Sequence, residues 1–295
     1  MSTGFYEEDF QRVALASEKH PFLPETSIEI VRPLGGREPP KHVLFDFDGT
    51  LSLVREGWMD VMVPLMVEIL AATRSGESRE QLTAVARDFV TELTGKQTVY
   101  QMIRLAEEVH KRGGRPEEPL VYKRAYHDRL MARIAGRREA LRSGRASPPQ
   151  MLVPYSLELL DELRRRGVAL YVASGTDEKY VFEEVELLGL DEYFGKHVYG
   201  ALEDYKSYSK AMVIERILKE NRVEGASLLG FGDGYVEIQN IKAVGGLAVA
   251  VATDEAGRSG SPDPWKRDRL IGAGADLVIP DYRDWRRLVL YLWNE

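Results

Sequence analysis

His42-Val43-Leu44-Phe45-Asp46-Phe47-Asp48-Gly49-Thr50-Leu51 is the stretch that decides the fold of this 295-residue chain. Its apolar first half predicts a buried strand, and Asp46 and Asp48 follow directly at the strand's C-terminal end. From Pro154 onward, amphipathic helical patterns alternate with short apolar runs, which favours a parallel sheet with helices on both faces. Ligands of such sheets bind beyond the C-terminal strand ends, so we expect a site beside these two carboxylates.

The spacing of apolar residues divides the rest of the chain. Residues 55–149 carry helical stripes throughout and predict an inserted all-helical cap domain. Residues 41–54 and 150–295 then form the Rossmann-like α/β core. Residues 1–40 are rich in proline and predict an extended arm, with one short alternating strand inside Ser27–Val31.

Composition limits the possible functions of the chain. Its net charge is −7, which gives no basic footprint for nucleic acid. The absence of cysteine excludes disulfides, a thiolate zinc site and a cysteine nucleophile. The polar N-terminus is unlike a secretory signal, and no apolar run reaches membrane-spanning length. We therefore expect a cytoplasmic protein whose partner is a small molecule, without a membrane or nucleic-acid partner.

Polar clusters recur where the predicted strands end or the helices begin. They are Asp46 and Asp48, Ser174-Gly175-Thr176, Lys206 or Lys210, and Gly232-Asp233-Gly234 with Glu237. A lone pair of acids after a strand is often only a turn or a helix cap. A parallel sheet would bring all four clusters to one edge, and this conjunction favours a catalytic site.

These motifs resemble those of the haloacid dehalogenase-like hydrolase superfamily. Residues 46–51 match its first motif, Ser174-Gly175-Thr176 its second, and a lysine at a helix start its third. Residues 232–237 are similar to its fourth motif, with Glu237 where aspartate is more common. The likeness covers residues 42 to about 280, and residues 51–150 correspond to a cap insertion.

The resemblance implies roles for the first and last motifs. Asp46 would be a nucleophile that forms an aspartyl-phosphate, and Asp48 would be the general acid and base. Asp46, the carbonyl of Asp48 and Asp233 would bind Mg²⁺, which prefers hard oxygen ligands. Glu237 would support that metal, either directly or through water.

The second and third motifs are expected to bind the phosphoryl group. Ser174 and the amide of Gly175 would contact its oxygens, and a catalytic lysine would offset its charge. Lys210 is preferred over Lys206, because Ser209 before it is a good N-cap for the following helix. Thr50 and Thr176 are further candidates for substrate binding.

The cap is expected to reach the substrate through one loop. Thr94-Gly95-Lys96-Gln97-Thr98 interrupts the helical stripes, so Lys96 and Gln97 are candidate substrate contacts, although a plain turn between helices has the same pattern. Arg55 and Trp58, soon after the first motif, are further candidates to border the pocket, and Arg55 fits a surface position at the hinge equally well. No role follows from the sequence for Pro262–Arg267.

Together these features predict a magnesium-dependent phosphatase of a small phosphate monoester, with a sugar phosphate as the expected class. Asp48 argues against a dehalogenase, because the resemblance implies that dehalogenases lack this second acid. A phosphomutase would use the same residues and remains an alternative. A phospho-acceptor signalling domain also pairs acids with a lysine, but the large insertion and Asp48 argue against it.

Overall fold

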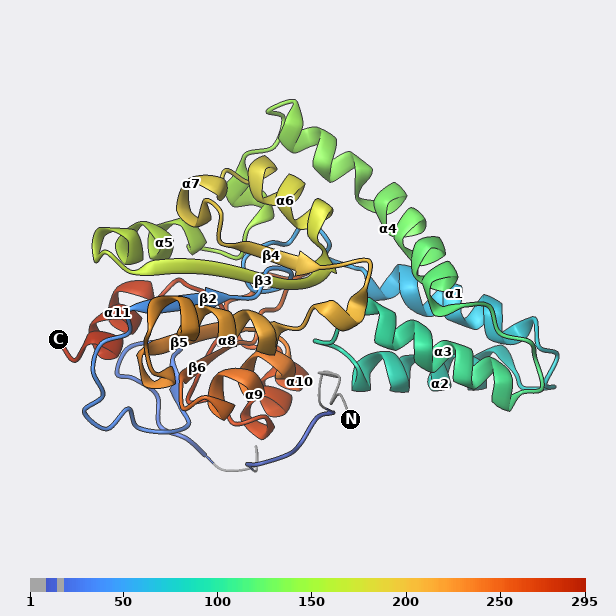
Figure 1. The fold of residues 1–295 in the computed structure, drawn as a ribbon, viewed down its shortest axis with the longest axis horizontal. Coiled ribbons are helices and arrows are strands. Elements are labelled where there is room, and N and C mark those ends of the chain that lie inside the picture. The colour runs from blue at the N-terminus through green and yellow to red at the C-terminus, as the bar shows by residue number, and fades with distance from the viewer. Residues whose placement is uncertain (1–8, 15–18) are drawn as a thin grey trace.

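A computed structural model describes residues 9–14 and 19–295, and its centre is a seven-stranded sheet (Figure 1). The strand order across the sheet is β1-β7-β6-β5-β2-β3-β4. The strands are β1 (Glu29–Ile30), β2 (His42–Phe45), β3 (Ala169–Asp177), β4 (Val198–Ala201), β5 (Leu228–Gly232), β6 (Leu247–Val251) and β7 (Leu277–Ile279).

The sheet is parallel except at one edge. β2 is an interior strand of the sheet and pairs in parallel with both β3 and β5. β1 falls in the segment predicted to hold a short strand, and it pairs antiparallel with β7. The predicted parallel sheet is thus confirmed, with one antiparallel strand at the edge. The position of β2 between β3 and β5 places Asp46 between the ends of these two neighbours.

Helices cover both faces of the sheet, as predicted. Side chains of β2 alternate between two apolar cores, Val43 and Phe45 in one and Leu44 in the other. The first core receives α5 (Ser156–Arg165), α6 (Glu178–Leu187), α7 (Asp191–Phe194) and α11 (Trp285–Trp293). The second core receives α8 (Lys210–Asn221), α9 (Tyr235–Ala243) and α10 (Pro264–Gly272).

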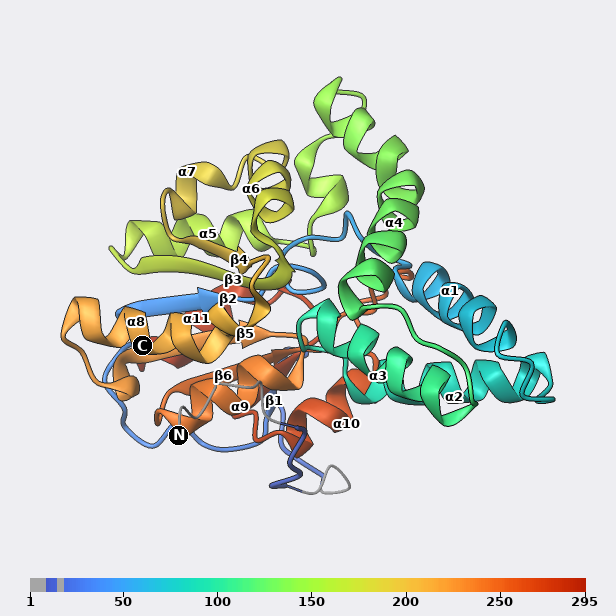
Figure 2. The ribbon, with the colours of Figure 1, turned by 45° about the vertical axis from the view of Figure 1, so that its right-hand side comes forward.

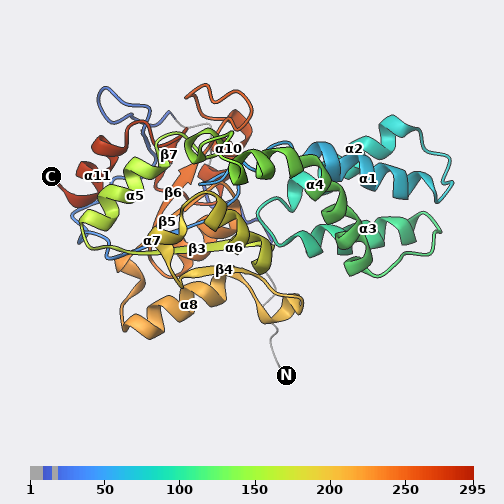
Figure 3. The same ribbon diagram turned by 90° about the horizontal axis from the view of Figure 1, so that it is seen from above.

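The predicted helical insertion is also present. It consists of α1 (Met59–Ala71), α2 (Arg79–Glu92), α3 (Thr98–Lys111) and α4 (Pro119–Arg142). These helices stand beside the sheet, and only α4 leads back across the core toward α6 (Figures 2 and 3). The apolar stripes predicted from the sequence form the interior of this insertion, which continues the first core. We call α1–α4 and the loops between them the cap.

Some local features differ from the sequence prediction. β3 continues through Ser174-Gly175-Thr176 to Asp177, although its pairing with β4 is irregular between Ala173 and Asp177. α10 was not expected in the unassigned segment after Ser261, and it begins at Pro264 with Asp263 as its N-cap. Short 3-10 helices occur at Pro148–Met151, Tyr205–Ser207 and Gly225–Ser227.

The predicted N-terminal arm is described only in part. Residues 1–8 and 15–18 of that arm lie outside the described residues. Phe10 packs edge-on against Tyr235, and the amide of Val13 donates to the carbonyl of Gly272. Phe10 and Val13 of the arm therefore contact α9 and α10, while β1 joins the edge of the sheet beside β7. Among the helices of residues 9–14 and 19–295, none combines the length and apolarity needed to cross a membrane.

Candidate active site

The loop after β2 carries the first motif into the site. The amide of Asp46 donates to the carbonyl of Phe231, which continues the pairing of β2 with β5. Gly49 has a φ of +76°, and a β-carbon there would lie 2.2 Å from Oδ2 of Asp233. A residue with a side chain would therefore push the loop away from Asp233, so glycine is what lets the two motifs meet.

Asp46 is paired with the lysine preferred from the sequence. Lys210 is the first residue of α8, and its Nζ lies 2.8 Å from Oδ1 of Asp46 and also contacts Glu237. The hydroxyl of Ser209 accepts from the amide of Met212 and caps the helix, as expected. All of the paired side chains are buried. Lys206, in contrast, is exposed and lies over the ring of Tyr205.

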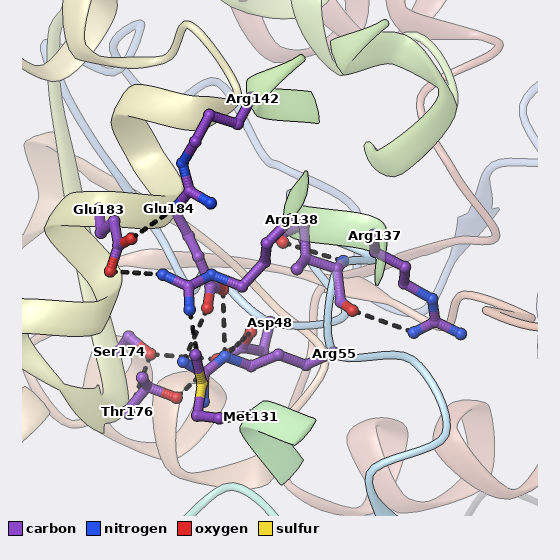
Figure 4. A network of polar contacts seen from close by, with 12 residues as sticks. Asp48, Arg55, Met131, Arg137, Arg138, Arg142, Ser174, Thr176, Glu183 and Glu184 are labelled. Carbon is purple, nitrogen blue, oxygen red and sulfur yellow. Dashed lines mark hydrogen bonds and ion pairs between the residues drawn. The ribbon is translucent and has the colours of Figure 1, made fainter. Parts of the chain in front are cut away.

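Asp48 is held by groups from β3 and by Arg55 (Figure 4). Arg55 lies in the segment between the first motif and α1, which we call the cap hinge. The hydroxyl of Thr176 donates to its Oδ2 at 2.8 Å, and the hydroxyl of Ser174 lies 3.4 Å from the same oxygen. Nε of Arg55 lies 3.6 Å from its Oδ1, while the Arg55 guanidinium forms two hydrogen bonds with Glu184 of α6. The second motif thus directly adjoins the second acid of the first motif.

Asp233 follows β5 and lies next to Gly49 of the first motif. Its Oδ2 accepts from Nζ of Lys266 at 2.8 Å, and the same ammonium lies 2.6 Å from Oε1 of Glu255. Its Oδ1 lies 3.5 Å from the hydroxyl of Thr50. The backbone of Thr50 is held in place, because the hydroxyl of Tyr282 donates to its carbonyl.

Burial and mutual repulsion change how the acids titrate. Burial raises the pKa of Asp46 to about 7, and Asp233 and Asp48 add to the rise while Lys210 opposes it. Burial also raises the pKa of Asp48 to about 6, against the opposing effect of Arg55. A carboxyl with such a pKa can hold a proton near neutral pH, as a general acid must.

Cap and core together line one pocket above these acids. From the core come Asp46, Asp48, Ser174, Gly175, Thr176, Asp177, Lys210, Asp233 and Gly234. From the hinge and cap come Arg55, Trp58, Met62, Thr94, Gly95, Lys96, Thr98, Gln101, Lys123, Tyr126, His127 and Leu130. The four sequence motifs therefore form the floor of the pocket, and the cap forms its walls.

All residues of the cap loop 94–98 except Gln97 line this pocket. A β-carbon on Gly95 would lie 3.2 Å from Cα of Gly234, so the loop touches the fourth motif directly. Lys96 lines the pocket, and its ammonium lies 2.6 Å from Asp9 of the N-terminal arm. Gln97 does not line the pocket among the described residues; its amide donates to the carbonyls of Tyr205 and Tyr208.

Several pocket residues were not identified from the sequence. Gln101 of α3 and Lys123, Tyr126 and His127 of α4 face the site, and Lys123 contacts Asp177. One pattern in the sequence could have identified the α4 residues. Tyr122, Tyr126, Leu130 and Ile134 recur every four residues and are buried, so they mark the inward face of the helix. Lys123 and His127 each follow one of these four residues. Glu184, Glu255 and Lys266 carry no comparable sequence signal.

The donor set fits a hard divalent cation. Six carboxylates and three cations take part in the ion pairs around Asp46, Asp48 and Asp233. They are Asp46, Asp48, Glu184, Asp233, Glu237 and Glu255, with Arg55, Lys210 and Lys266. Negative charge is thus in excess, and oxygen donors of this kind suit Mg²⁺.

Within residues 9–14 and 19–295, no three His, Cys, Asp or Glu side chains are arranged as a metal site. The expected ligand set contains only two carboxylates, Asp46 and Asp233, since its third member is the carbonyl of Asp48. Glu237, the other candidate from the sequence, is paired with Lys210.

Comparisons with known proteins find the same fold in other chains. A structure from Clostridium difficile, a β-phosphoglucomutase, is 13% identical with a TM-score of 0.57, over 86% of this chain and 97% of that one. A structure from Clostridium acetobutylicum, described as a predicted phosphatase, is 16% identical with a TM-score of 0.55, over 86% and 99%. One from Haemophilus somnus, described as a predicted phosphoglycolate phosphatase, is 17% identical with a TM-score of 0.51, over 84% and 97%.

These low identities establish the shared fold alone. No curated protein sequence matches the chain. The family model of haloacid dehalogenase-like hydrolases, however, matches residues 40–245, which is most of the chain and includes all four motifs. The resemblance inferred from the motifs is therefore confirmed, and the chain belongs to the haloacid dehalogenase-like hydrolase family, as a hydrolase with an α/β core and a helical cap.

Proposed function

We propose that this protein is a magnesium-dependent phosphatase that hydrolyses a small phosphate monoester through an aspartyl-phosphate on Asp46. The observation that carries the proposal is the pairing of Asp46 with Lys210 at 2.8 Å, on the floor of a pocket that Asp48 also lines. The lysine holds the nucleophile in place and offsets the charge of an incoming phosphate.

In the first half-reaction, a carboxylate oxygen of Asp46 attacks phosphorus and the bond to the leaving oxygen breaks. Asp48 donates its proton to that leaving oxygen, for which its raised pKa of about 6 is suited. In the second half-reaction, Asp48 takes a proton from water as the water attacks the acyl phosphate. Inorganic phosphate leaves, and Asp46 is regenerated.

The phosphoryl oxygens would be bound by Ser174, the amide of Gly175 and Lys210, with Thr50 and Thr176 beside them. Thr176 and Ser174 already orient Asp48, so phosphate binding and proton transfer share one set of hydroxyl groups. Asp46, Asp233 and the carbonyl of Asp48 would hold Mg²⁺, with Glu237 in support, and the bound cation reduces repulsion between the two anions.

The walls of the pocket support a small polar substrate. Trp58, Met62 and Leu130 give it an apolar side, while Lys96, Lys123 and Gln101 supply polar groups. A cap over the site excludes bulk water and favours a metabolite over a protein substrate. A sugar phosphate is the class we propose, since its hydroxyl groups match these polar contacts.

A screen of phosphorylated metabolites with Mg²⁺, run beside Asp46→Asn, tests the proposal. We expect free phosphate from at least one sugar monophosphate with the parent protein and none above background with the variant. An isomeric phosphate accumulating in place of free phosphate would identify a phosphomutase. A stable acyl phosphate that forms without turnover would identify a phospho-acceptor domain.

A further inference from the structure

A second lysine of the acidic cluster, Lys266, places its ammonium against two carboxylates that differ from those paired with Lys210. Its Nζ lies 2.8 Å from Oδ2 of Asp233 and 2.6 Å from Oε1 of Glu255. The three side chains are between 11% and 18% exposed. Among the described residues, Asp233 lines the pocket and Lys266 does not.

The position of Lys266 is fixed by the start of α10. Lys266 lies in the first turn of α10, and its amide donates to the side chain of Asp263, the N-cap. The next residue, Arg267, is paired with Glu29 of the edge strand β1. Farther along α10, Leu270 and Ile271 are fully buried. The helix therefore presents Lys266 to Asp233 from a fixed base.

An ammonium and a divalent cation compete for Asp233. Mg²⁺ binds oxygen at about 2.0–2.1 Å and tolerates little distortion of its coordination. The positive charge of Lys266, held on the same carboxylate, opposes the approach of that cation in a site that water screens poorly. A metal ion on Asp233 would therefore bind less tightly while Lys266 stays on the same carboxylate.

Glu255 supplies the place to which the ammonium can withdraw. It follows β6, and its Oε1 would lie 3.1 Å from a β-carbon on Gly49, so it lies beside the first-motif loop. Since Lys266 already contacts Glu255, the lysine can leave Asp233 by a small shift without entering solvent. Its charge then stays balanced by a carboxylate.

We propose that Lys266 is a built-in counter-ion of Asp233, which Mg²⁺ displaces and Glu255 then retains, so that this pair sets the metal affinity of the site. The proposal rests on the proposed function for the identity of the metal alone. It concerns binding in the absence of substrate, and its test needs no turnover.

The two members of the pair have opposite effects on metal binding. Replacing Lys266 with a neutral residue removes both the competitor and its charge, so Mg²⁺ binds more tightly. Replacing Glu255 with glutamine leaves Asp233 as the sole carboxylate partner of the lysine, so Mg²⁺ binds more weakly. In the absence of Lys266, the Glu255 substitution has little left to act on.

The experiment is titration of metal-free, full-length protein with Mg²⁺ by calorimetry, repeated with Mn²⁺ by electron paramagnetic resonance. Lys266→Met should lower the Kd by about tenfold or more, which corresponds to the loss of one nearby charge. Glu255→Gln should raise the Kd, and the double variant should bind like Lys266→Met. Lys242→Met, which breaks a lysine–aspartate pair with Asp276 away from the site, should leave the Kd unchanged.

Weaker or unchanged metal binding in Lys266→Met would overturn the proposal, since it would mean that the lysine orients Asp233 for the metal or has no influence on it. An equal loss on Glu255→Gln with and without Lys266 would also overturn it. Circular dichroism of the metal-free variants checks folding, and Lys266→Gln gives a second neutral side chain if Lys266→Met does not fold. Failure of Asp46→Asn to abolish turnover would refute the phosphatase mechanism and leave these binding results standing.

Discussion

The guanidinium of Arg55 forms two hydrogen bonds with the carboxylate of Glu184, at 2.9 and 3.1 Å, with both side chains buried. Figure 4 shows this pair beside Asp48, whose Oδ1 lies 3.6 Å from Nε of Arg55. The contact joins the segment that leads into the cap to α6 of the core. It therefore links the position of Asp48 to the hinge of the cap.

Removal of one partner should be costly. Glu184→Gln leaves the Arg55 charge buried without its main partner, and we expect a loss of about 3–5 kcal/mol in the free energy of unfolding. The control is Glu183→Gln, whose neighbouring carboxylate is 43% exposed and pairs with Arg138 and Arg142. That change should cost at most about 1 kcal/mol. Equal losses in urea unfolding would show that the buried pair has no special role.

Asp48→Asn should separate leaving-group chemistry from nucleophilic attack. An amide cannot donate the proton, so we expect kcat for an alkyl phosphate to fall about 10²–10⁴-fold. A p-nitrophenyl ester needs no protonation of its leaving group, and its aspartyl-phosphate should still form rapidly. Rapid-quench measurements on both esters test this. An equal loss of the phosphorylation rate with the two esters would contradict the acid role of Asp48.

Gly95 should be required for the cap loop to reach the core. An alanine β-carbon would lie 3.2 Å from Cα of Gly234 and from the amide nitrogen of Tyr235, so the loop must retreat from the fourth motif. Because small displacements at a site are costly, Gly95→Ala should lower kcat/KM by at least about tenfold. Gly113→Ala is the matched control, with a φ of +73° and nothing within 4 Å of the new carbon. It should lose stability by about 1 kcal/mol and keep its kcat/KM.

His127 should make the protein less stable in acid. Burial, with Arg55 nearby, lowers the pKa of His127 from 6.5 to about 4. Between these values the unfolded chain binds more protons than the folded one, so the contribution of this group falls as pH drops below 6.5.

We expect the stability difference between parent and His127→Gln to shrink from pH 7 to pH 5, by about 1 kcal/mol after allowance for solvent screening of the half-buried ring. Urea unfolding at the two pH values measures it. A difference that stays constant or grows in acid would contradict the lowered pKa.

The site's floor could be predicted from the sequence because its residues follow strands. A parallel sheet places every C-terminal strand end at one edge, so Asp46 and Asp233 meet although they are far apart in the chain. The choice of Lys210 depended on a local signal, the capping hydroxyl of Ser209. Both inferences needed only the direction of the chain and the start of a helix.

The pocket residues of the cap could not be predicted in the same way. Nor could the charged residues that pair with the acids of the motifs, such as Lys266. α4 is charged on most of its surface, so the sequence does not show which of its polar side chains face the core. Lys266 lies on a helix that was not expected, although the Asp263-Pro264 start is a helix signal. Its meeting with Asp233 depends on the packing of α10 against the sheet, which sequence spacing does not encode.

The most direct test of the account is to locate the phosphoryl group during turnover. The parent protein is mixed with Mg²⁺ and the best substrate of the screen, quenched in acid and reduced with borohydride, which converts an aspartyl-phosphate to homoserine. Peptide mass spectrometry of the parent should place homoserine at position 46. The Asp48→Asn variant should also give homoserine at position 46 and at no other aspartate position. Turnover of the parent without homoserine at position 46, or with the product at another aspartate, would contradict Asp46 as the nucleophile.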